Sequence, residues 1–170
     1  EAAAVFPESA RADTDDAPHV VNSSWSVEET GCNLNFASDL QALRAAGILP
    51  IFSAGNEGPN ADTSKSPANN PGAFAVGAIN NNSQIYSYSS RGPASCAMAD
   101  KSFPRLVAPG VAVRTTDLFG LYAIESGTSV AAPHVAGALA LLLNFNPHLS
   151  VDQQERALIE EPRNIGARAA

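Results

Sequence analysis

The sequence has few cysteines, no cluster of basic residues and no long apolar run, and each of these absences excludes a class of protein. Its 170 residues include 17 acidic and 10 basic side chains, a formal charge of −7, and no run of Lys or Arg could neutralise several phosphates. We therefore expect no nucleic-acid partner. The longest apolar stretch, residues 135–143, is short and rich in Ala and Gly, so we expect no membrane segment.

The cysteine content leaves the redox state open. Only Cys32 and Cys96 occur, and neither lies in a CxxC motif or at a spacing typical of a metal site. They are either free thiols or partners in a single disulfide. The first ten residues, EAAAVFPESA, lack the basic start and the apolar stretch of a signal peptide, so we expect a secreted form to begin upstream of Glu1.

Apolar residues make up 45% of the chain, enough for the core of one domain or of part of a larger one. Buried strands are predicted at residues 19–25, 48–55 and 73–79, and a helix at 35–46 lies between the first two. A strand, helix, strand order with nearly continuous apolar strands is typical of parallel sheets. The pattern predicts an α/β fold, with a mainly parallel sheet flanked by helices.

The second half of the chain predicts short strands and two helices. Turns and short strands are expected in residues 79–93 and 105–116. Residues 129–144 are predicted to form a helix that is apolar on every side and therefore buried. A last helix is expected to open at Ser150, where Gln153 can complete a capping box, and to close at Pro162.

Ser129 is a candidate nucleophile because it lies where a loop meets the apolar helix. Its backbone N–H would be one of the unpaired donors of the helix N-terminus, half of a site for an oxyanion. Gly127 leaves room for a substrate backbone, and Pro133 is close enough to the helix start to forfeit at most one hydrogen bond. A serine nucleophile also needs a general base. The alternative is that Ser129 only caps the helix.

Asn56 is a candidate for the second oxyanion donor. It follows a predicted buried strand, at the edge where open parallel sheets bind ligands. Its side-chain amide could donate a hydrogen bond to developing negative charge. The alternative is that the segment GNEGPN is only a turn, because Asn and Gly are common turn residues.

Several segments between Pro18 and Leu158 carry a resemblance to a known family. They are VVNSSWS, ILPIFSAGNEGP, SPANNPGAFAVGAI, YSSRGP, VAPGVAV and SGTSVAAPHVAGALALLL. In order and spacing they resemble the subtilisin-like serine proteases of the peptidase S8 family, especially the bacillopeptidase F type. The resemblance implies a three-layer α/β domain that is incomplete on its N-terminal side. We expect a core in residues 18–161, preceded by a connecting loop or helix end at 1–17.

The resemblance also assigns roles to residues. Ser129 corresponds to the nucleophile and Asn56 to the oxyanion-hole amide. The edges that hold an extended peptide, together with the turn before the nucleophile, comprise Ser24, Trp25, Ser26, Ser53, Ala54, Gly55, Gly127 and Thr128. Such edges bind peptides by strand addition. A secreted, extracellular protein is likewise implied by the family.

The aspartate and histidine of the catalytic triad are missing from the sequence. The D-[ST]-G and H-G-T-H motifs that carry them in the family do not occur in this chain. His134 is five residues from Ser129, about 140° around a helix, and His148 lies further on. His19 follows the aspartates of 13–16, which lie in a polar loop. We therefore expect the base to come from sequence outside this chain.

Some positions depart from the family pattern. Ser26 stands where the family usually has glycine, and Arg105 stands where an acidic residue is frequent, which puts a local ion pair in doubt. Trp25 could line a substrate pocket, and the alternative is a tryptophan that lies in the core or anchors its loop. We expect no cofactor and assign no metal ligands. Structural Ca²⁺ is possible by resemblance, but residues 80–83 favour a turn.

Two hypotheses for function follow. The first is a serine endopeptidase that hydrolyses peptide bonds through an acyl-enzyme on Ser129, inactive without the missing N-terminal half of its domain. Its partners are then a peptide or protein substrate and that half. The second is a non-catalytic peptide-binding or scaffold remnant. In either case the missing half would leave an open strand edge and uncovered apolar faces.

Overall fold

The structure is a computed structural model that describes residues 17–29, 31–96 and 100–167. Predictions for residues 1–16, among them the acidic loop before His19, lie outside the described residues. Four strands form a parallel sheet, β1 (Val21–Ser23), β2 (Pro50–Ser53), β3 (Phe74–Ile79) and β4 (Leu106–Pro109), in the order β1-β2-β3-β4. This confirms the α/β class and the parallel sheet.

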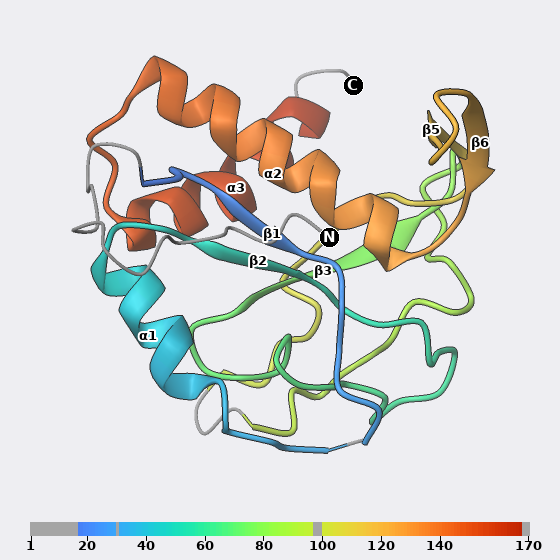
Figure 1. The fold of residues 1–170 in the computed structure, drawn as a ribbon, viewed down its shortest axis with the longest axis horizontal. Helices are drawn as coiled ribbons and strands as arrows, with labels where there is room; N and C mark the ends of the chain where they lie inside the picture. The colour runs from blue at the N-terminus through green and yellow to red at the C-terminus, as the bar shows by residue number, and fades with distance from the viewer. Residues whose placement is uncertain (1–16, 30, 97–99, 168–170) are drawn as a thin grey trace.

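Helices cover both faces of this sheet (Figure 1). They are α1 (Ala37–Ala45), α2 (Thr128–Phe145) and α3 (Val151–Ala167). Alternation along the strands separates two cores, because successive side chains point to opposite faces. Ile51 of β2 packs with the buried side of α2, whereas its neighbour Phe52 packs with Leu40 of α1. The three-layer arrangement therefore follows from strands that are apolar on both faces.

Helix α2 is buried on one side only, so the prediction that it is buried all round is wrong. Ala131, Val135 and Leu139 are buried against the sheet. On the outer side, Leu141 is 74% exposed and Phe145 is 89% exposed, because nothing in the described part of the chain covers them.

The length of α2 also differs from the expectation. It has 18 residues with a mean hydropathy of 1.4, which is enough by length and composition to cross a membrane. The length of α2 therefore does not exclude a membrane-spanning helix. Its packing against β2 and β3 is nevertheless what a core helix shows.

The start of α3 agrees with the sequence prediction, but its end does not. Ser150 N donates to Gln153 Oε1 at 2.8 Å and Gln153 N donates to Ser150 Oγ at 3.4 Å, the two bonds of a capping box. The helix continues past Pro162 to Ala167, so the predicted closure at Pro162 is wrong. A proline removes one bond of the helical ladder and leaves the bonds of its neighbours in place.

A hairpin of β5 (Val113–Thr116) and β6 (Tyr122–Glu125) precedes α2. The two strands predicted in 105–116 are confirmed as β4 and β5, but β6 was missed. Its turn carries a local signal, because Asp117 Oδ1 accepts hydrogen bonds from Phe119 N at 2.8 Å and Leu121 N at 2.7 Å. The short strand expected in 79–93 is reduced to one bridge between Ile79 and Ile85.

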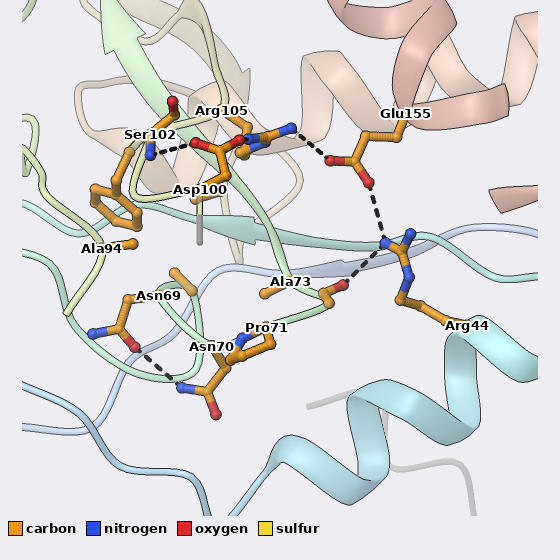
Figure 2. Close-up of a pocket in the computed structure, with 14 residues that line it drawn as sticks. Arg44, Asn69, Asn70, Pro71, Ala73, Ala94, Asp100, Ser102, Arg105 and Glu155 are labelled. Atoms are coloured by element: carbon orange, nitrogen blue, oxygen red, sulfur yellow. Dashed lines mark hydrogen bonds and ion pairs between the residues drawn. The ribbon is translucent and has the colours of Figure 1, made fainter. Parts of the chain in front are cut away.

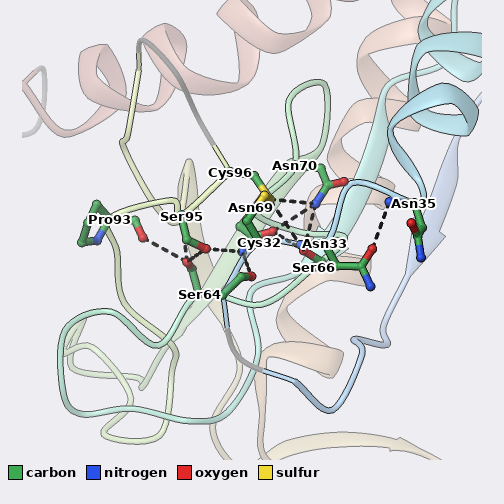
Figure 3. Close-up of a disulfide and its surroundings, with 11 residues drawn as sticks. Cys32, Asn33, Asn35, Ser64, Ser66, Asn69, Asn70, Pro93, Ser95 and Cys96 are labelled. Atoms are coloured by element: carbon green, nitrogen blue, oxygen red, sulfur yellow. Dashed lines mark hydrogen bonds between the residues drawn. A yellow bond between two sulfur atoms is a disulfide. The ribbon is translucent and has the colours of Figure 1, made fainter.

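Cys32 and Cys96 form a disulfide, which resolves the choice that the sequence left open (Figure 3). Their Cα atoms lie 4.9 Å apart, within the range for a disulfide. Buried amides surround it: Asn70 Nδ2 donates to Cys96 Sγ at 3.5 Å, and Asn69 Nδ2 donates to Gly31 O at 2.8 Å. The bridge and these bonds hold the loop after β1 against the loop that precedes β4.

A chain of ion pairs ties α1, α3 and the start of β4 together (Figure 2). Arg44 pairs with Asp152 at 2.7 Å and with Glu155 at 3.3 Å. Arg105 pairs with Glu155 at 3.0 Å and also with Asp100. The doubt about a local ion pair at Arg105 is therefore removed, because acidic partners come from α3 and from the loop before β4.

Candidate active site

The candidate site lies where the carboxyl ends of β1 and β2 meet the N-terminus of α2. Loops at this edge of a parallel sheet commonly bind ligands. β1 leads into Ser24, β2 leads into Asn56, and α2 begins at Thr128. The side chains of Asn56 and Ser129 are exposed, whereas Thr128 is fully buried beneath them.

Ser129 is the second residue of α2 rather than its cap. The N-cap position belongs to Gly127, which has no side chain that could accept a hydrogen bond. The alternative interpretation of Ser129 as a capping residue is therefore wrong. As an early helical residue, Ser129 keeps a backbone N–H that has no acceptor one turn back within the helix.

Asn56 takes the place of the missing cap from another loop. Its Oδ1 accepts hydrogen bonds from Thr128 N at 2.9 Å and from Thr128 Oγ1 at 3.1 Å. Thr128 Oγ1 in turn accepts from Gly55 N at 3.1 Å. Because a backbone N–H can only donate, these bonds fix which end of the amide faces Thr128. Asn56 Nδ2 is left as a donor at the surface, and in the described residues no acceptor is bonded to it.

Position 127 requires glycine in this arrangement. Its φ of 152° is rare for residues with a side chain. A Cβ there would lie 3.3 Å from Asn56 Nδ2 and 3.4 Å from Asn56 Oδ1. Gly127 N also donates to Gly110 O at 2.8 Å, which fixes the turn before α2 to the end of β4. The conformation of Gly127 therefore sets the distance between Asn56 and the first turn of α2.

The residues at the end of β2 are more enclosed than a peptide-binding edge requires. Ser53, Ala54 and Gly55 are all buried. Ala54 N donates to Val76 O and Gly55 O accepts from Ser90 N, both at 2.9 Å. These two backbone groups are occupied within the protein, so 53–55 can line a pocket but cannot pair a peptide through them.

The residues after β1 divide between two roles. Trp25 packs edge-on against Phe36 at 5.3 Å and Phe52 at 6.0 Å between ring centroids, the arrangement expected of a tryptophan that anchors its loop. It remains 47% exposed. Ser24 Oγ donates to the backbone carbonyl of Ser129 at 2.9 Å. Ser26 is half-buried in the same loop.

Sequence reasoning missed a group of charged and polar residues behind Asn56. Ser90 Oγ donates to Glu57 Oε2 at 2.8 Å and accepts from Glu57 N at 3.1 Å. Lys65 pairs with Glu57 Oε1 at 3.1 Å and is largely buried. These contacts hold the loop that carries Asn56, and the signal for them was the acidic residue directly after it.

No histidine in the described part of the chain reaches Ser129. His134 Nδ1 contacts Val130 O at 2.8 Å, one turn back on the outer side of α2. His19 lines a pocket together with Leu143, which lies about 21 Å along α2 from Ser129 at 1.5 Å per residue. His148 follows the end of α2. The described residues also contain no cluster of three potential metal ligands, and structural Ca²⁺ stays a prediction.

The geometry gives the site a definite chemical capacity. The exposed hydroxyl of Ser129 lies on the first turn of α2, beside the amide of Asn56. The oxygen of this amide accepts hydrogen bonds from Thr128, whereas its nitrogen has no acceptor in the described residues. Two N–H donors near one hydroxyl can stabilise the negative charge that forms when the hydroxyl attacks a carbonyl. The fold and the site are thus those of an α/β protein with an exposed serine hydroxyl and an asparagine amide at the start of a helix, and no histidine of the described residues contacts that serine.

Solved structures of other proteins share this fold. Sphericase superposes with a TM-score of 0.73 at 30% identity, over 83% of this chain and 47% of that one. A cold adapted subtilisin-like serine proteinase gives a TM-score of 0.68 at 30% identity, over 84% and 48% of the two chains.

Residues 3–166 match the model of the subtilase family, Peptidase S8. The chain belongs to this family of serine peptidases. Bacillopeptidase F of Bacillus subtilis (strain 168) is 39% identical over 84% of this chain and 10% of its own length. Subtilisin BL of Lederbergia lenta is 35% identical over 88% of this chain and 51% of its own length. The chain therefore spans about a tenth of the first relative and about half of the second.

Proposed function

We propose that this chain is the serine-bearing part of a subtilisin-type endopeptidase. Ser129 is the nucleophile, and Asn56 Nδ2 with the Ser129 N–H forms the oxyanion hole. The observation that carries the proposal is the anchoring of Asn56 Oδ1 by Thr128, at 2.9 and 3.1 Å, which leaves Nδ2 free beside the nucleophile's turn. The bond from Thr128 N also caps α2, and together the two bonds leave the donor end of the amide, rather than the acceptor end, at the surface.

The proposed reaction proceeds through an acyl-enzyme. Ser129 Oγ attacks the carbonyl carbon of a peptide bond while its proton passes to a general base, and the carbonyl oxygen becomes an oxyanion held by the two N–H donors. The C–N bond then breaks, and the base returns the proton to the leaving amine. Water attacks the ester by the reverse proton transfers and frees Ser129. The base is a histidine oriented by an aspartate, both from sequence outside this chain.

The partner that brings these residues is the N-terminal half of the family's catalytic domain. Two features of the described residues support this proposal. β1 is an edge strand, and the outer side of α2 exposes Leu141 and Phe145. Unpaired edges and apolar faces of this kind are normally covered. We also propose that the protein is secreted, since the Cys32–Cys96 disulfide suits an oxidising compartment.

A non-catalytic peptide-binding remnant is the competing function. It is favoured by one observation, that no base reaches Ser129 within the described residues. Labelling with a fluorophosphonate probe separates the two functions, because the probe reacts only with an activated serine. We expect labelling of the full-length protein and none of the 170-residue chain alone. Ser129→Ala should abolish the labelling of the full-length protein. Ser126→Ala, which changes a serine of the turn before α2, should not.

Other outcomes would contradict the proposal. Absence of labelling in the full-length protein would favour the non-catalytic remnant. Labelling of the 170-residue chain that depends on Ser129 would place a base within these residues, against the assignment of the base to outside sequence.

A further inference from the structure

Pro133 leaves one backbone carbonyl of α2 without its helical partner. In an α-helix the N–H of residue i bonds the carbonyl of residue i−4, so the amide of position 133 would serve the carbonyl of Ser129. Proline has no N–H to donate. Pro133 lies inside α2, five positions after Thr128. The carbonyl left free by Pro133 therefore belongs to the candidate nucleophile itself.

The Ser24 hydroxyl occupies the position of the absent donor. Ser24 Oγ lies 2.9 Å from the Ser129 carbonyl oxygen, although the two residues are 105 positions apart in the sequence. Asn22 Nδ2 lies 3.3 Å from Ser24 Oγ on the other side. A carbonyl can only accept and an amide nitrogen can only donate, so the hydroxyl hydrogen must point at Ser129. The bonds run in one direction, from Asn22 through Ser24 to Ser129.

We infer that Ser24 is a positioning residue for the nucleophile, whose hydroxyl substitutes for the amide that Pro133 lacks. This inference rests on the proposed function of Ser129. The bond from the Ser24 hydroxyl affects how the nucleophile is held in place. A helix that satisfied the Ser129 carbonyl internally would fix the nucleophile to α2 alone, whereas this bond fixes it to the end of β1. The orientation of Ser129 then depends on the same loop that contributes Trp25 and Ser26 to the predicted substrate edge.

A double-mutant cycle in the full-length protein tests the inference. Pro133→Ala gives position 133 an N–H that can bond the Ser129 carbonyl within the helix. We expect Ser24→Ala to lower the fluorophosphonate labelling rate about three- to tenfold when Pro133 is present, the range for one lost hydrogen bond. In the Pro133→Ala background the same change should have less than about a twofold effect. Ser24→Thr keeps the hydroxyl and should restore most of the rate.

Two readouts separate positioning from a merely structural role. Ser23→Ala, on the neighbouring residue of β1, is the matched control and should leave the rate unchanged. Rates are compared per folded molecule, from unfolding curves of each variant. The ¹³C shift of the Ser129 carbonyl in the same variants reports the hydrogen bond without any catalysis. We expect it to move on Ser24→Ala, and to move back when Pro133→Ala is added.

The outcomes that would overturn the inference are distinct from failure of the proposed function. Equal losses of rate in both backgrounds, or no loss in either, would contradict it. A lower stability with an unchanged rate per folded molecule would do the same. A full-length protein that is not labelled at all would instead overturn the proposed function, and with it the role of Ser24 in catalysis, whatever the carbonyl shift shows about the bond.

Discussion

At the scale of single residues, the geometry of the candidate site depends on Thr128. It is fully buried, and its backbone and hydroxyl both bond Asn56 Oδ1. The sequence placed Thr128 among the substrate-binding residues by resemblance. Its burial gives it a supporting role beneath Asn56, and a contact between Thr128 and a peptide stays a prediction. Asn56 and Ser129, which lie above Thr128, are exposed and could contact a peptide.

Gly127→Ala tests how closely the turn and the amide fit. An added Cβ would lie 3.3 Å from Asn56 Nδ2 in a backbone conformation that alanine disfavours. We expect the labelling rate of the full-length protein to fall about a hundredfold, by comparison with the loss of one oxyanion donor from subtilisin. The free energy of unfolding should fall by only about 1–2 kcal/mol. Fluorophosphonate labelling and urea unfolding measure the two effects.

Gly120→Ala is the matched control for this prediction. Gly120 also has a positive φ, 76°, and nothing is within 4 Å of a Cβ added there. Alanine in this conformation should lower the free energy of unfolding by about 1–2 kcal/mol and leave labelling unchanged. Equal losses of the labelling rate in the two variants would show that backbone strain, rather than the contact with Asn56, is responsible.

At the scale of elements, ion pairs connect α1, α3 and the start of β4. Arg105 joins the start of β4 to α3 through Glu155 and to the preceding loop through Asp100. Hydrogen bonds from Ser102, followed by the Arg105 guanidinium, lower the pKa of Asp100 from 3.8 to about 2. Each hydrogen bond and the guanidinium favour the charged carboxylate over the neutral acid.

The lowered pKa of Asp100 predicts a dependence of stability on pH. The folded-state pKa, about 2, lies below the ordinary value of 3.8, so the carboxylate stabilises the folded chain at higher pH. That contribution is lost as the pH falls from about 4 toward 2. Asp100→Asn should therefore weaken the pH dependence of the urea midpoint between about pH 4 and 2. Glu28→Gln, at an exposed acidic residue, should leave that dependence unchanged. The same pH dependence in Asp100→Asn as in the unmodified protein would contradict this explanation.

At the scale of the whole molecule, the sheet is covered on both faces but the outer side of α2 is not. Leu141 and Phe145 extend from it with 74% and 89% exposure. Single exposed apolar residues are common on folded proteins, whereas these two lie one turn apart and form an apolar patch that a further segment of protein could cover. We have proposed the N-terminal half of the catalytic domain as that segment.

Leu141→Glu tests whether this face is covered in the full-length protein. A charge buried against apolar side chains should lower the free energy of unfolding by about 2 kcal/mol or more. Leu118→Glu is the matched control, because Leu118 is 98% exposed on the turn between β5 and β6. We expect it to change stability by less than about 0.5 kcal/mol. Similar effects of the two substitutions in urea unfolding would argue against a covering segment on α2.

The sequence by itself determined what depends on neighbours along the chain. Apolar periodicity placed β1 to β5 and the helices, and the Ser150–Gln153 capping box was legible because both of its bonds join residues three apart. The position of Ser129 at the start of a helix and of Asn56 after a strand was equally local. The missed strand β6 and the continuation of α3 past Pro162 show the limit, because a four-residue strand carries little periodicity and a proline removes only one bond of the helical ladder.

Only the tertiary structure decided the contacts between distant segments. The Cys32–Cys96 disulfide spans 64 residues, the Asn56–Thr128 bonds span 72, and the Ser24–Ser129 bond spans 105. No pattern in the sequence specifies which side chain meets which across such separations, because the meeting depends on how the sheet and helices pack. The sequence alone identified the chemical groups of the candidate site. Their orientation depends on the packing around Thr128 and Pro133, which only the tertiary structure shows.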